Sequence, residues 1–465
     1  MNDLKKILTG VAIATTLYSA WSVWNTRGND HESVVHAQTQ NWATPTSQRM
    51  GIQLVESRDA SGSPAYPVEP GDLLFFTNSG TSYGSKNPTN SVVVINARTK
   101  KPIAISSLSS AYTDRYASHG IGMSADGKYI FLPSLFNIGA TAPAGKSPNS
   151  LLVLDGRTMK LHQVIVSGGP THHVKLFRDS TGKSRVLVED WNWVTSAMNG
   201  KGLYELDPAD DNKVVNGLLP GEVHGNMYST FSTPDGKYFY ASVPPPGRND
   251  LIPSIEGWLA KIDIATWKVV QAIPMKKYPL WTVFSKDGKW AWVTQSADET
   301  VVKLQRALTP SERDKIVAET HVGPGPYGMR LTLDEKEVWV ADKGELGPKD
   351  GSTLTIIDTA DNRVKQTIAT DCVRNDHIIL SPDGSEMWAT CNSSFEIVVL
   401  DAKSHAIKSR IPMPNLGDSH GGVFVSYTQG PGGVKAEVVS DQNGLQGSAL
   451  DAYLNGTPWV TAGVR

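Results

Sequence analysis

The stretch SPDGSEMWATC, residues 381–391, contains the unit from which the fold is built: a turn of the type Ser-x-Asp-Gly between two strands. The same unit recurs as SADGKYIFLPS (124–134), STPDGKYFYASV (232–243), SKDGKWAWVTQ (285–295) and TLDEKEVWVAD (332–342). Each copy is followed by a third strand that ends in an Asp-containing turn, and then by a short fourth strand. Four strands per unit, repeated at about fifty residues, are typical of the blades of a β-propeller.

Counting the innermost strands predicts seven blades. These strands start near His119, His172, Tyr228, Trp281, Tyr327, His377 and His420. The last of them, HGGVFVSY (420–427), has no full set of partner strands after it, whereas the strands from Leu73 onward lack a clear inner one. We therefore expect an all-β, seven-bladed β-propeller over residues 61–465, closed by pairing of the C-terminal inner strand with N-terminal outer strands, because closure hides the sheet edges.

The composition agrees with many short strands and excludes one class of partner. The chain has 42 Gly, 28 Pro and 13 Trp, which suits strands joined by turns better than long helices. Its 44 Lys and Arg are balanced by 46 Asp and Glu, without a basic block. A nucleic-acid partner is therefore not expected.

The N-terminus has the pattern of an export signal. Lys5 and Lys6 precede an apolar run from Ile7 to Trp24, and Val35-His36-Ala37 offers a small-residue cleavage site. We expect residues 1–37 to be a signal peptide, with an uncleaved membrane anchor as the alternative. Residues 38–60 would then be an N-terminal arm, and the protein would be periplasmic.

Only two cysteines, Cys372 and Cys391, are present. Cys372 precedes an inner strand and Cys391 ends the second strand of the same blade, so both should lie near one rim. A disulfide is the favoured interpretation, since disulfides form outside the cytoplasm. Copper ligation by thiolate is the alternative.

Six of the 11 histidines share one position, at or just before the start of an innermost strand. They are His119, His172, His173, His224, His377 and His420. In a propeller such positions from different blades converge on one mouth of the central channel. Several neutral imidazoles in one place suit a late first-row metal such as copper or zinc. The alternative is that each is a turn histidine bonded to backbone.

Charged residues in long loops are expected at the same face, because the loop between strands two and three of a blade also opens there. These loops carry Lys86, which could bind an anion, and Glu256, which could act as a general base toward a metal-bound water. Glu189 and Asp190 end a second strand and point the same way. They are candidate further ligands or acceptors that orient a histidine.

The distribution of histidines over the blades resembles that of a known family. The motifs are SHG at Ser118–Gly120 and at Ser419–Gly421, THH at Thr171–His173, and DH at Asp376–His377. A propeller with these motifs looks like thiocyanate dehydrogenase, which is related in architecture to the catalytic domain of nitrous oxide reductase.

This resemblance implies a trinuclear copper centre and the conversion of thiocyanate and water into cyanate and elemental sulfur. It implies that the six histidines are the copper-site residues, that His119 and His420 are also catalytic, and that Lys86 and Glu256 lie beside the substrate. Two departures stand out. No copper-binding cupredoxin-like domain follows the propeller, and the blades that start at Trp281 and Tyr327 have no histidine at the inner position.

Other functions are compatible with the same pattern. A non-enzymatic surface propeller of the YVTN type would offer its face to protein partners, and a propeller of the cytochrome d1 type would hold a haem through an axial histidine. A copper oxidoreductase without its own electron-transfer domain would need a soluble acceptor such as a cytochrome c. The sequence leaves open whether the protein is a homodimer.

Overall fold

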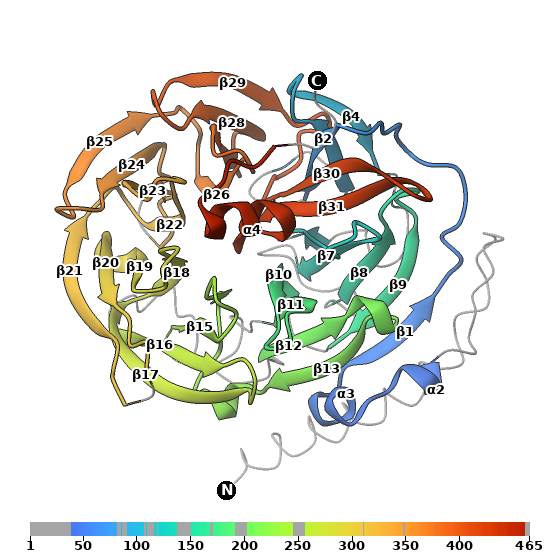
Figure 1. Ribbon diagram of the computed structural model, residues 1–465, viewed down its shortest axis with the longest axis horizontal. Coiled ribbons are helices and arrows are strands. Elements are labelled where there is room, and N and C mark those ends of the chain that lie inside the picture. The colour runs from blue at the N-terminus through green and yellow to red at the C-terminus, as the bar shows by residue number, and fades with distance from the viewer. Residues whose placement is uncertain are drawn as a thin grey trace, which may run out of the picture.

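A computed structural model describes residues 39–80, 85, 91–106, 108, 116–118, 120–136, 150–167, 171–190, 202–244, 256–309, 311–346 and 349–460. Seven sheets are arranged around a central axis (Figure 1). The predicted seven-bladed β-propeller is therefore confirmed. The predicted signal peptide lies outside the described residues.

Five blades have four antiparallel strands each, which follow one another from the channel to the rim. They are β10 Thr171–Arg178, β11 Ser184–Asp190, β12 Gly202–Asp207 and β13 Lys213–Leu218; β14 Thr230–Ser232, β15 Tyr238–Val243, β16 Glu256–Asp263 and β17 Lys268–Lys277; β18 Pro279–Phe284, β19 Trp290–Gln295, β20 Thr300–Gln305 and β21 Lys315–His321; β22 Pro326–Leu331, β23 Glu337–Asp342, β24 Thr353–Asp358 and β25 Val364–Ala369; β26 Asn375–Leu380, β27 Glu386–Cys391, β28 Glu396–Asp401 and β29 Ile407–Pro412.

Another blade combines both ends of the chain. Its strands are β2 Leu73–Ser79, β3 Ser91–Asn96, β4 Lys101–Ile105 and β30 Val423–Gly430, extended at the channel side by β31 Gly433–Asp441 and β32 Gly444–Leu445. The C-terminal β30 pairs with β2 in antiparallel register, with Leu73 opposite Ser426 and Phe76 opposite Val423. Strands far apart in sequence thus share one sheet, as the missing inner strand at the N-terminus predicts.

The remaining blade is widened by the N-terminal segment. It contains β5 Tyr116–Ser118, β6 Gly122–Met123, β7 Tyr129–Phe136, β8 Ser150–Asp155, β9 Leu161–Val166 and β1 Gln53–Ser57. The expected arm is thus partly a strand, since β1 pairs with β9 at the rim. Before it, helices α2 (Thr39–Trp42) and α3 (Pro45–Met50) reach the next blade, where the Trp42 indole donates to the carbonyl of Asp211.

One turn explains the sequence repeat. In the last full copy, the Ser381 hydroxyl donates to Asp383 at 2.6 Å and accepts from the Glu386 amide at 2.9 Å. Gly384 takes a positive φ of 74°, which a residue with a side chain rarely adopts. The same hydroxyl and carboxylate contacts recur at Ser124, Thr233, Ser285 and Thr332.

Burial follows the position of a strand in its blade. Every residue of β22, β23, β26 and β27 is buried, whereas most residues of the outer β25 and β29 are exposed. The hydrophobic core therefore lies between neighbouring blades, and the inner strands form the wall of a closed channel.

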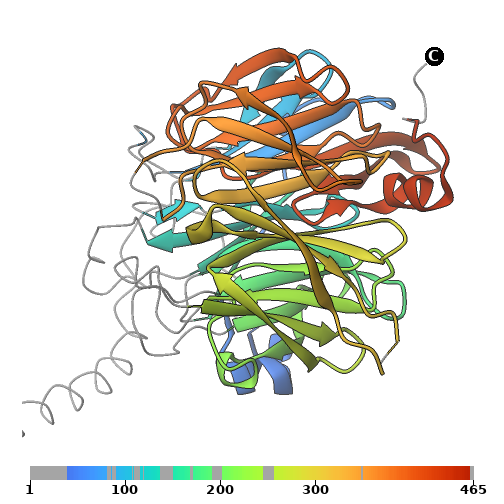
Figure 2. The same ribbon diagram turned by 90° about the vertical axis from the view of Figure 1, so that its left-hand side faces the viewer.

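The C-terminal elements cover one face of the propeller. Helix α4 (Gly447–Asn455) and β31 lie over the channel in Figure 1, and Figure 2 shows them on one side of the blades. Arg178, the last residue of β10, donates to Asp451 and to the carbonyl of Gly447. The inner strands thus end at this face and begin at the opposite one, where the histidines were predicted.

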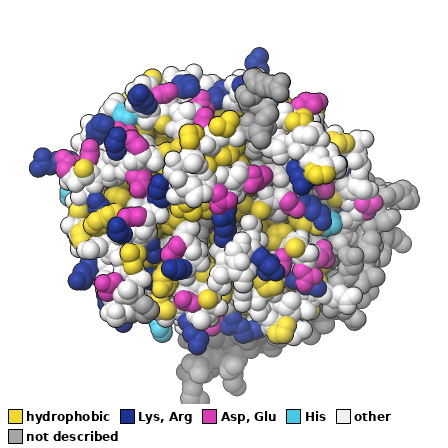
Figure 3. All heavy atoms as spheres, in the orientation of Figure 1, with side chains coloured by type: hydrophobic (Ala, Val, Ile, Leu, Met, Phe, Trp, Pro, Cys, Tyr) yellow, Lys and Arg dark blue, Asp and Glu magenta, His cyan; other side chains and the backbone are white. Residues whose placement is uncertain are grey.

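Two further features concern the surface and the helices. On the face that carries α4, acidic and basic side chains are interspersed (Figure 3). Short 3-10 helices occur at Pro208–Asp210, Pro220–Glu222 and Ser296–Asp298. None of the helices in the described part of the chain is both long and apolar enough to cross a membrane.

Candidate metal centre

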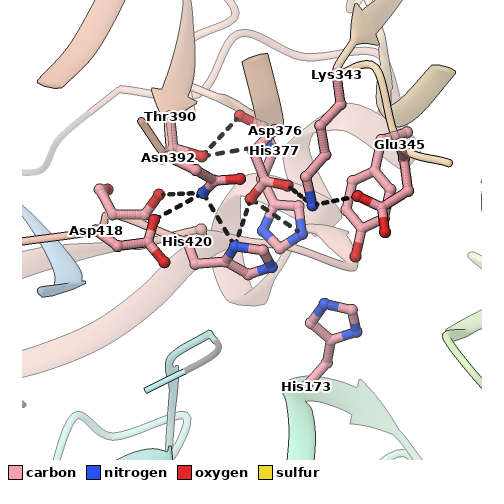
Figure 4. A network of polar contacts seen from close by, with 12 residues as sticks. His173, Lys343, Glu345, Asp376, His377, Thr390, Asn392, Asp418 and His420 are labelled. Carbon is pink, nitrogen blue, oxygen red and sulfur yellow. Dashed lines mark hydrogen bonds and ion pairs between the residues drawn. The ribbon is translucent and has the colours of Figure 1, made fainter. Parts of the chain in front are cut away.

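Four of the predicted histidines come together where the inner strands begin. His172 and His173 lie on β10, His377 lies on β26, and His420 precedes β30; all four are fully buried. Two groups of potential ligands overlap at His420: His172, His173 and His420, and Asp376, His377 and His420. Within each group the ligand atoms lie within 4.8 Å of one another. Figure 4 shows the rings of His173, His377 and His420 gathered around one space.

A β-bulge explains why neighbouring residues reach the same site. Successive side chains of a regular strand point to opposite faces, and a bulge changes that alternation locally. The pairing of β10 with β11 shifts register between Thr171 and Val174, across the two histidines. The same shift occurs in β26 between Asn375 and Ile378, across Asp376 and His377.

Each of three rings is oriented through its Nδ1 atom. Nδ1 of His172 donates to the carbonyl of Tyr228 at 3.1 Å, and Nδ1 of His173 donates to Glu189 at 3.0 Å. Nδ1 of His420 lies 2.9 Å from a carboxylate oxygen of Asp376. This arrangement of acceptor, imidazole and Nε2 is the usual environment of a metal-bound histidine, since the outer contact sets the tautomer and the direction of the ring.

Burial also keeps the imidazoles neutral. Removal from water lowers the pKa of His172, His377 and His420 well below the ordinary histidine value. Mutual repulsion with His420 lowers the pKa of His172 and of His377 further. A neutral imidazole keeps the lone pair that a metal ion needs.

Two buried ion networks support the histidines. Lys175 donates to Glu189 at 2.6 Å, beside His173. Burial nevertheless raises the pKa of Glu189 to about 7, with the lysine and hydrogen bonds opposing the rise. On the opposite side, Nζ of Lys343 lies 2.8 Å from Asp376 and 3.2 Å from Glu345.

The sequence predicted part of this support. Glu189 contacts a histidine as expected of an orienting acceptor, while Asp190 is buried at the end of β11 and belongs to neither ligand group. Lys175, Lys343 and Glu345 were not predicted. Little in the sequence distinguishes these three residues, because a lysine or glutamate within a few residues of a strand end is usually exposed to solvent. Here Lys343 and Glu345 follow β23 into the buried channel mouth.

Aromatic side chains complete the wall where histidines are missing. Tyr228, Trp281 and Tyr327 occupy the matching places in three consecutive blades, in agreement with the expected asymmetry. Trp281 lies 4.6 Å from His377 between ring centroids, and the hydroxyls of Tyr228 and Tyr327 are 2.8 Å apart. All three are buried to at least 98%. This side of the cluster is therefore closed to bulk water.

The other predicted site residues lie elsewhere or are not described. His224 is exposed in the loop before β14, with a φ of 59°, and belongs to neither ligand group. Glu256 is exposed at the start of β16, opposite Lys277 of β17. Lys86 and His119 lie outside the described residues, and their roles stay predictions.

The two cysteines form the predicted disulfide. Cys372 and Cys391 are joined, with their Cα atoms 5.4 Å apart. Neither therefore offers a thiolate to a metal, and the bridge encloses the β26–β27 hairpin that carries Asp376 and His377.

Comparison of the whole chain with known proteins identifies its family. The model of the Cytochrome D1 heme domain matches residues 117–429, which is more than half of the chain. The chain belongs to the cytochrome D1 heme domain family. The matched range contains all four histidines of the cluster.

Solved structures resemble this family member in fold. The periplasmic gluconolactonase of Pseudomonas aeruginosa has a TM-score of 0.55 at 15% identity, over 76% of this chain and 99% of that one. Hydrazine synthase of Kuenenia stuttgartiensis has a TM-score of 0.51 at 16% identity, over 73% and 98% of the two chains. At these identities the likeness shows the propeller alone. No curated protein matches the chain in sequence.

Membership of the cytochrome D1 heme domain family raises the question of whether a haem fits the cluster. The centroids of His172 and His173 are 3.7 Å apart, and those of His377 and His420 are 4.5 Å apart. Tyr327 stacks on His377 at 5.5 Å. A macrocycle among these rings would have to displace them. The described side chains therefore fit metal ions at this level of the channel, and do not fit a haem there.

Proposed function

We propose that the protein is a periplasmic copper-dependent oxidoreductase that oxidises thiocyanate. The observation that carries the copper site is the convergence of four buried histidines from three blades, three of which contact an acceptor at Nδ1. Imidazole nitrogens without a matching number of carboxylates suit copper better than calcium or magnesium. The substrate is proposed from the resemblance in the histidine motifs.

The described residues offer ligands for more than one ion. His172, His173 and His420 would hold one ion, and Asp376 and His377 would hold a second that shares or adjoins His420. His119 and His224 are proposed to take part in a third position, as the resemblance implies. Copper bound here would supply electron acceptance and would lower the pKa of a bound water.

The protein's own groups would prepare the reaction. Thiocyanate and water become cyanate, elemental sulfur, two protons and two electrons. The buried wall of Tyr228, Trp281 and Tyr327 keeps bulk water away from that side of the cluster. Lys86 is proposed to attract the anion and Glu256 to accept a proton, and the electrons pass to an external acceptor such as a soluble cytochrome c.

A haem-binding propeller is the second candidate, because the family model is that of a haem domain. A non-enzymatic binding propeller is the third. Metal analysis and absorption spectroscopy of the purified protein separate them. We expect about three copper ions per chain and thiocyanate-dependent reduction of an electron acceptor. A haem absorption band, or the absence of stoichiometric metal, would contradict the proposal.

His420 gives the sharpest test because it belongs to both ligand groups. His420→Ala is expected to reduce the copper content by at least one ion per chain, since the remaining ligands no longer complete either site. The matched control is His405→Ala, which removes a histidine between β28 and β29 that contacts Glu337 and Gln366 of the neighbouring blade. Equal copper content in both variants would refute the assignment.

A further inference from the structure

A second chain segment reaches the histidine cluster from the opposite end of the channel. Residues 440–443, which comprise the end of β31 and the turn after it, are anchored to inner strands on two sides. The Arg330 guanidinium donates to the carbonyl of Gln442 at 2.8 Å, and Asp441 accepts from the Leu176 amide at 2.7 Å. Asn443 donates to the carbonyl of Leu176 at 2.9 Å. The backbone at Gln442 is therefore held across the channel.

The side chain of Gln442 extends from this segment to the cluster. A Cβ placed on Gly421 would lie 2.3 Å from Nε2 of Gln442 and 2.7 Å from Nδ1 of His377. A Cβ placed on Gly120 would lie 3.4 Å from the same Nε2. The carboxamide thus lies beside the glycines of both SHG motifs, which take positive φ angles of 94° and 113°. The missing side chains at these glycines leave room for it.

The carboxamide of Gln442 is buried, but its polar atoms form no hydrogen bonds with the described residues. Both ring nitrogens of the adjacent His377 also lack a hydrogen bond within the described ranges. A buried amide without a partner is unfavourable, so two such groups side by side indicate a ligand between them.

The chemistry of an amide narrows the kind of ligand. Its NH₂ group donates hydrogen bonds and adds no charge, so it can hold an anion without a buried ion pair. Its oxygen is a poor ligand for copper beside imidazole nitrogens. A small anion between the metal-site histidines and the amide would give a hydrogen-bond partner to both His377 and Gln442.

We propose that Gln442 is a substrate-binding residue that donates a hydrogen bond to a small anion held at the histidine cluster. This inference rests on the proposed metal site and adds to it a residue from the C-terminal segment. It assigns that segment, which is anchored to inner strands by Leu176 and Arg330, a direct part in selecting the substrate.

The test uses the full-length, copper-loaded protein with azide as the anion probe, followed by its charge-transfer absorption. Gln442→Leu is expected to keep the copper stoichiometry and to weaken azide binding at least 10-fold. Gln442→Glu keeps the shape but repels the anion, so it should weaken binding as well, and it carries the test if the leucine variant does not fold. The control is Gln446→Leu, which removes an amide of the same segment that bonds Leu176 and Asp441 and does not reach the cluster.

The outcomes are distinct. Unchanged azide affinity in a copper-loaded Gln442 variant would overturn this inference alone. Loss of copper in Gln442→Leu, with copper retained in Gln446→Leu, would also overturn it, because Gln442 would then be a ligand of the metal. A parent protein that binds no copper would overturn the proposed function together with this inference.

Discussion

At the scale of single residues, the carboxylate of Asp376 has two neighbours that define its role. One oxygen lies 2.9 Å from Nδ1 of His420, and the other lies 2.8 Å from Nζ of Lys343. We expect Asp376→Asn to lower copper affinity 10- to 100-fold, the usual effect of losing a group that orients or supplements a ligand. Copper titration against a competing chelator measures this.

The matched control for Asp376 is Asp314→Asn. Asp314 is also a buried aspartate paired with a lysine, at 2.8 Å from Lys261, but it belongs to neither ligand group. The control should lose stability and keep its copper affinity. Equal losses of affinity in the two variants would show that Asp376 acts only through the fold.

The raised pKa of Glu189 leads us to expect that the stability of the protein depends on pH. Its pKa of about 7 in the folded protein lies above the ordinary value of about 4.3, so the folded state holds the proton more tightly than the unfolded state. As the pH rises from about 5 to about 7, the free energy of unfolding of the metal-free parent should therefore fall relative to that of Glu189→Gln.

The comparison with Glu189→Gln isolates this effect. The lowered pKa values of His172, His377 and His420 act in the opposite direction, because stability from them is lost as the pH falls below about 6.5. They are present in both proteins and cancel in the difference. Urea unfolding of both proteins across this pH range is the measurement, and a constant difference would disprove the role of Glu189.

At the scale of elements, the disulfide closes the hairpin that carries part of the site. Cys372 and Cys391 are 19 residues apart in sequence. Replacing both by serine should lower the free energy of unfolding by about 3 kcal/mol in the chain-entropy model. Denaturant unfolding of the metal-free proteins tests the value.

The same variant also tests whether the bridge acts on the site. Asp376 and His377 are held by pairing of β26 with β27 as well as by the disulfide. The folded double variant should therefore keep its copper stoichiometry. Loss of copper at full secondary structure would show that the bridge itself positions these two residues.

At the scale of the whole molecule, Arg330 ties neighbouring blades to the C-terminal segment. Its guanidinium donates to the carbonyls of Ile378, Asp441 and Gln442, and the side chain is buried. Arg330→Met would leave buried carbonyls without donors, at about 1–3 kcal/mol each. We expect a loss of at least about 3 kcal/mol in the free energy of unfolding.

The regions in which hydrogen exchange increases in Arg330→Met distinguish a role across the whole molecule from a role in one blade. Hydrogen exchange should increase in β22 and β26 and also in residues 440–446, because all three lose a common donor. The control is Arg306→Met, a buried arginine that contacts Gly288 and Tyr240 away from the channel axis. Increased exchange confined to β22 would contradict the whole-molecule role.

The sequence by itself determined the architecture and the main candidate ligands. The Ser-x-Asp-Gly turn is a local structure whose hydrogen bonds join residues two to five apart, so its repetition could be counted without coordinates. His172, His173, His377 and His420 were predicted for the same reason, since their place at the start of an inner strand follows from the repeat. The cysteine pair followed from the positions of Cys372 and Cys391 within one blade.

Only the tertiary structure decided which groups surround those histidines. The contact of Asp376 with His420 crosses from one blade to the next, and Gln442 reaches the cluster from a hairpin that passes over the channel. Lys175 and Lys343 look like solvated residues in the sequence, but closure of the ring buries them. Such contacts join residues with no fixed separation along the chain, so no local pattern records them. They depend on the way seven blades close around one axis.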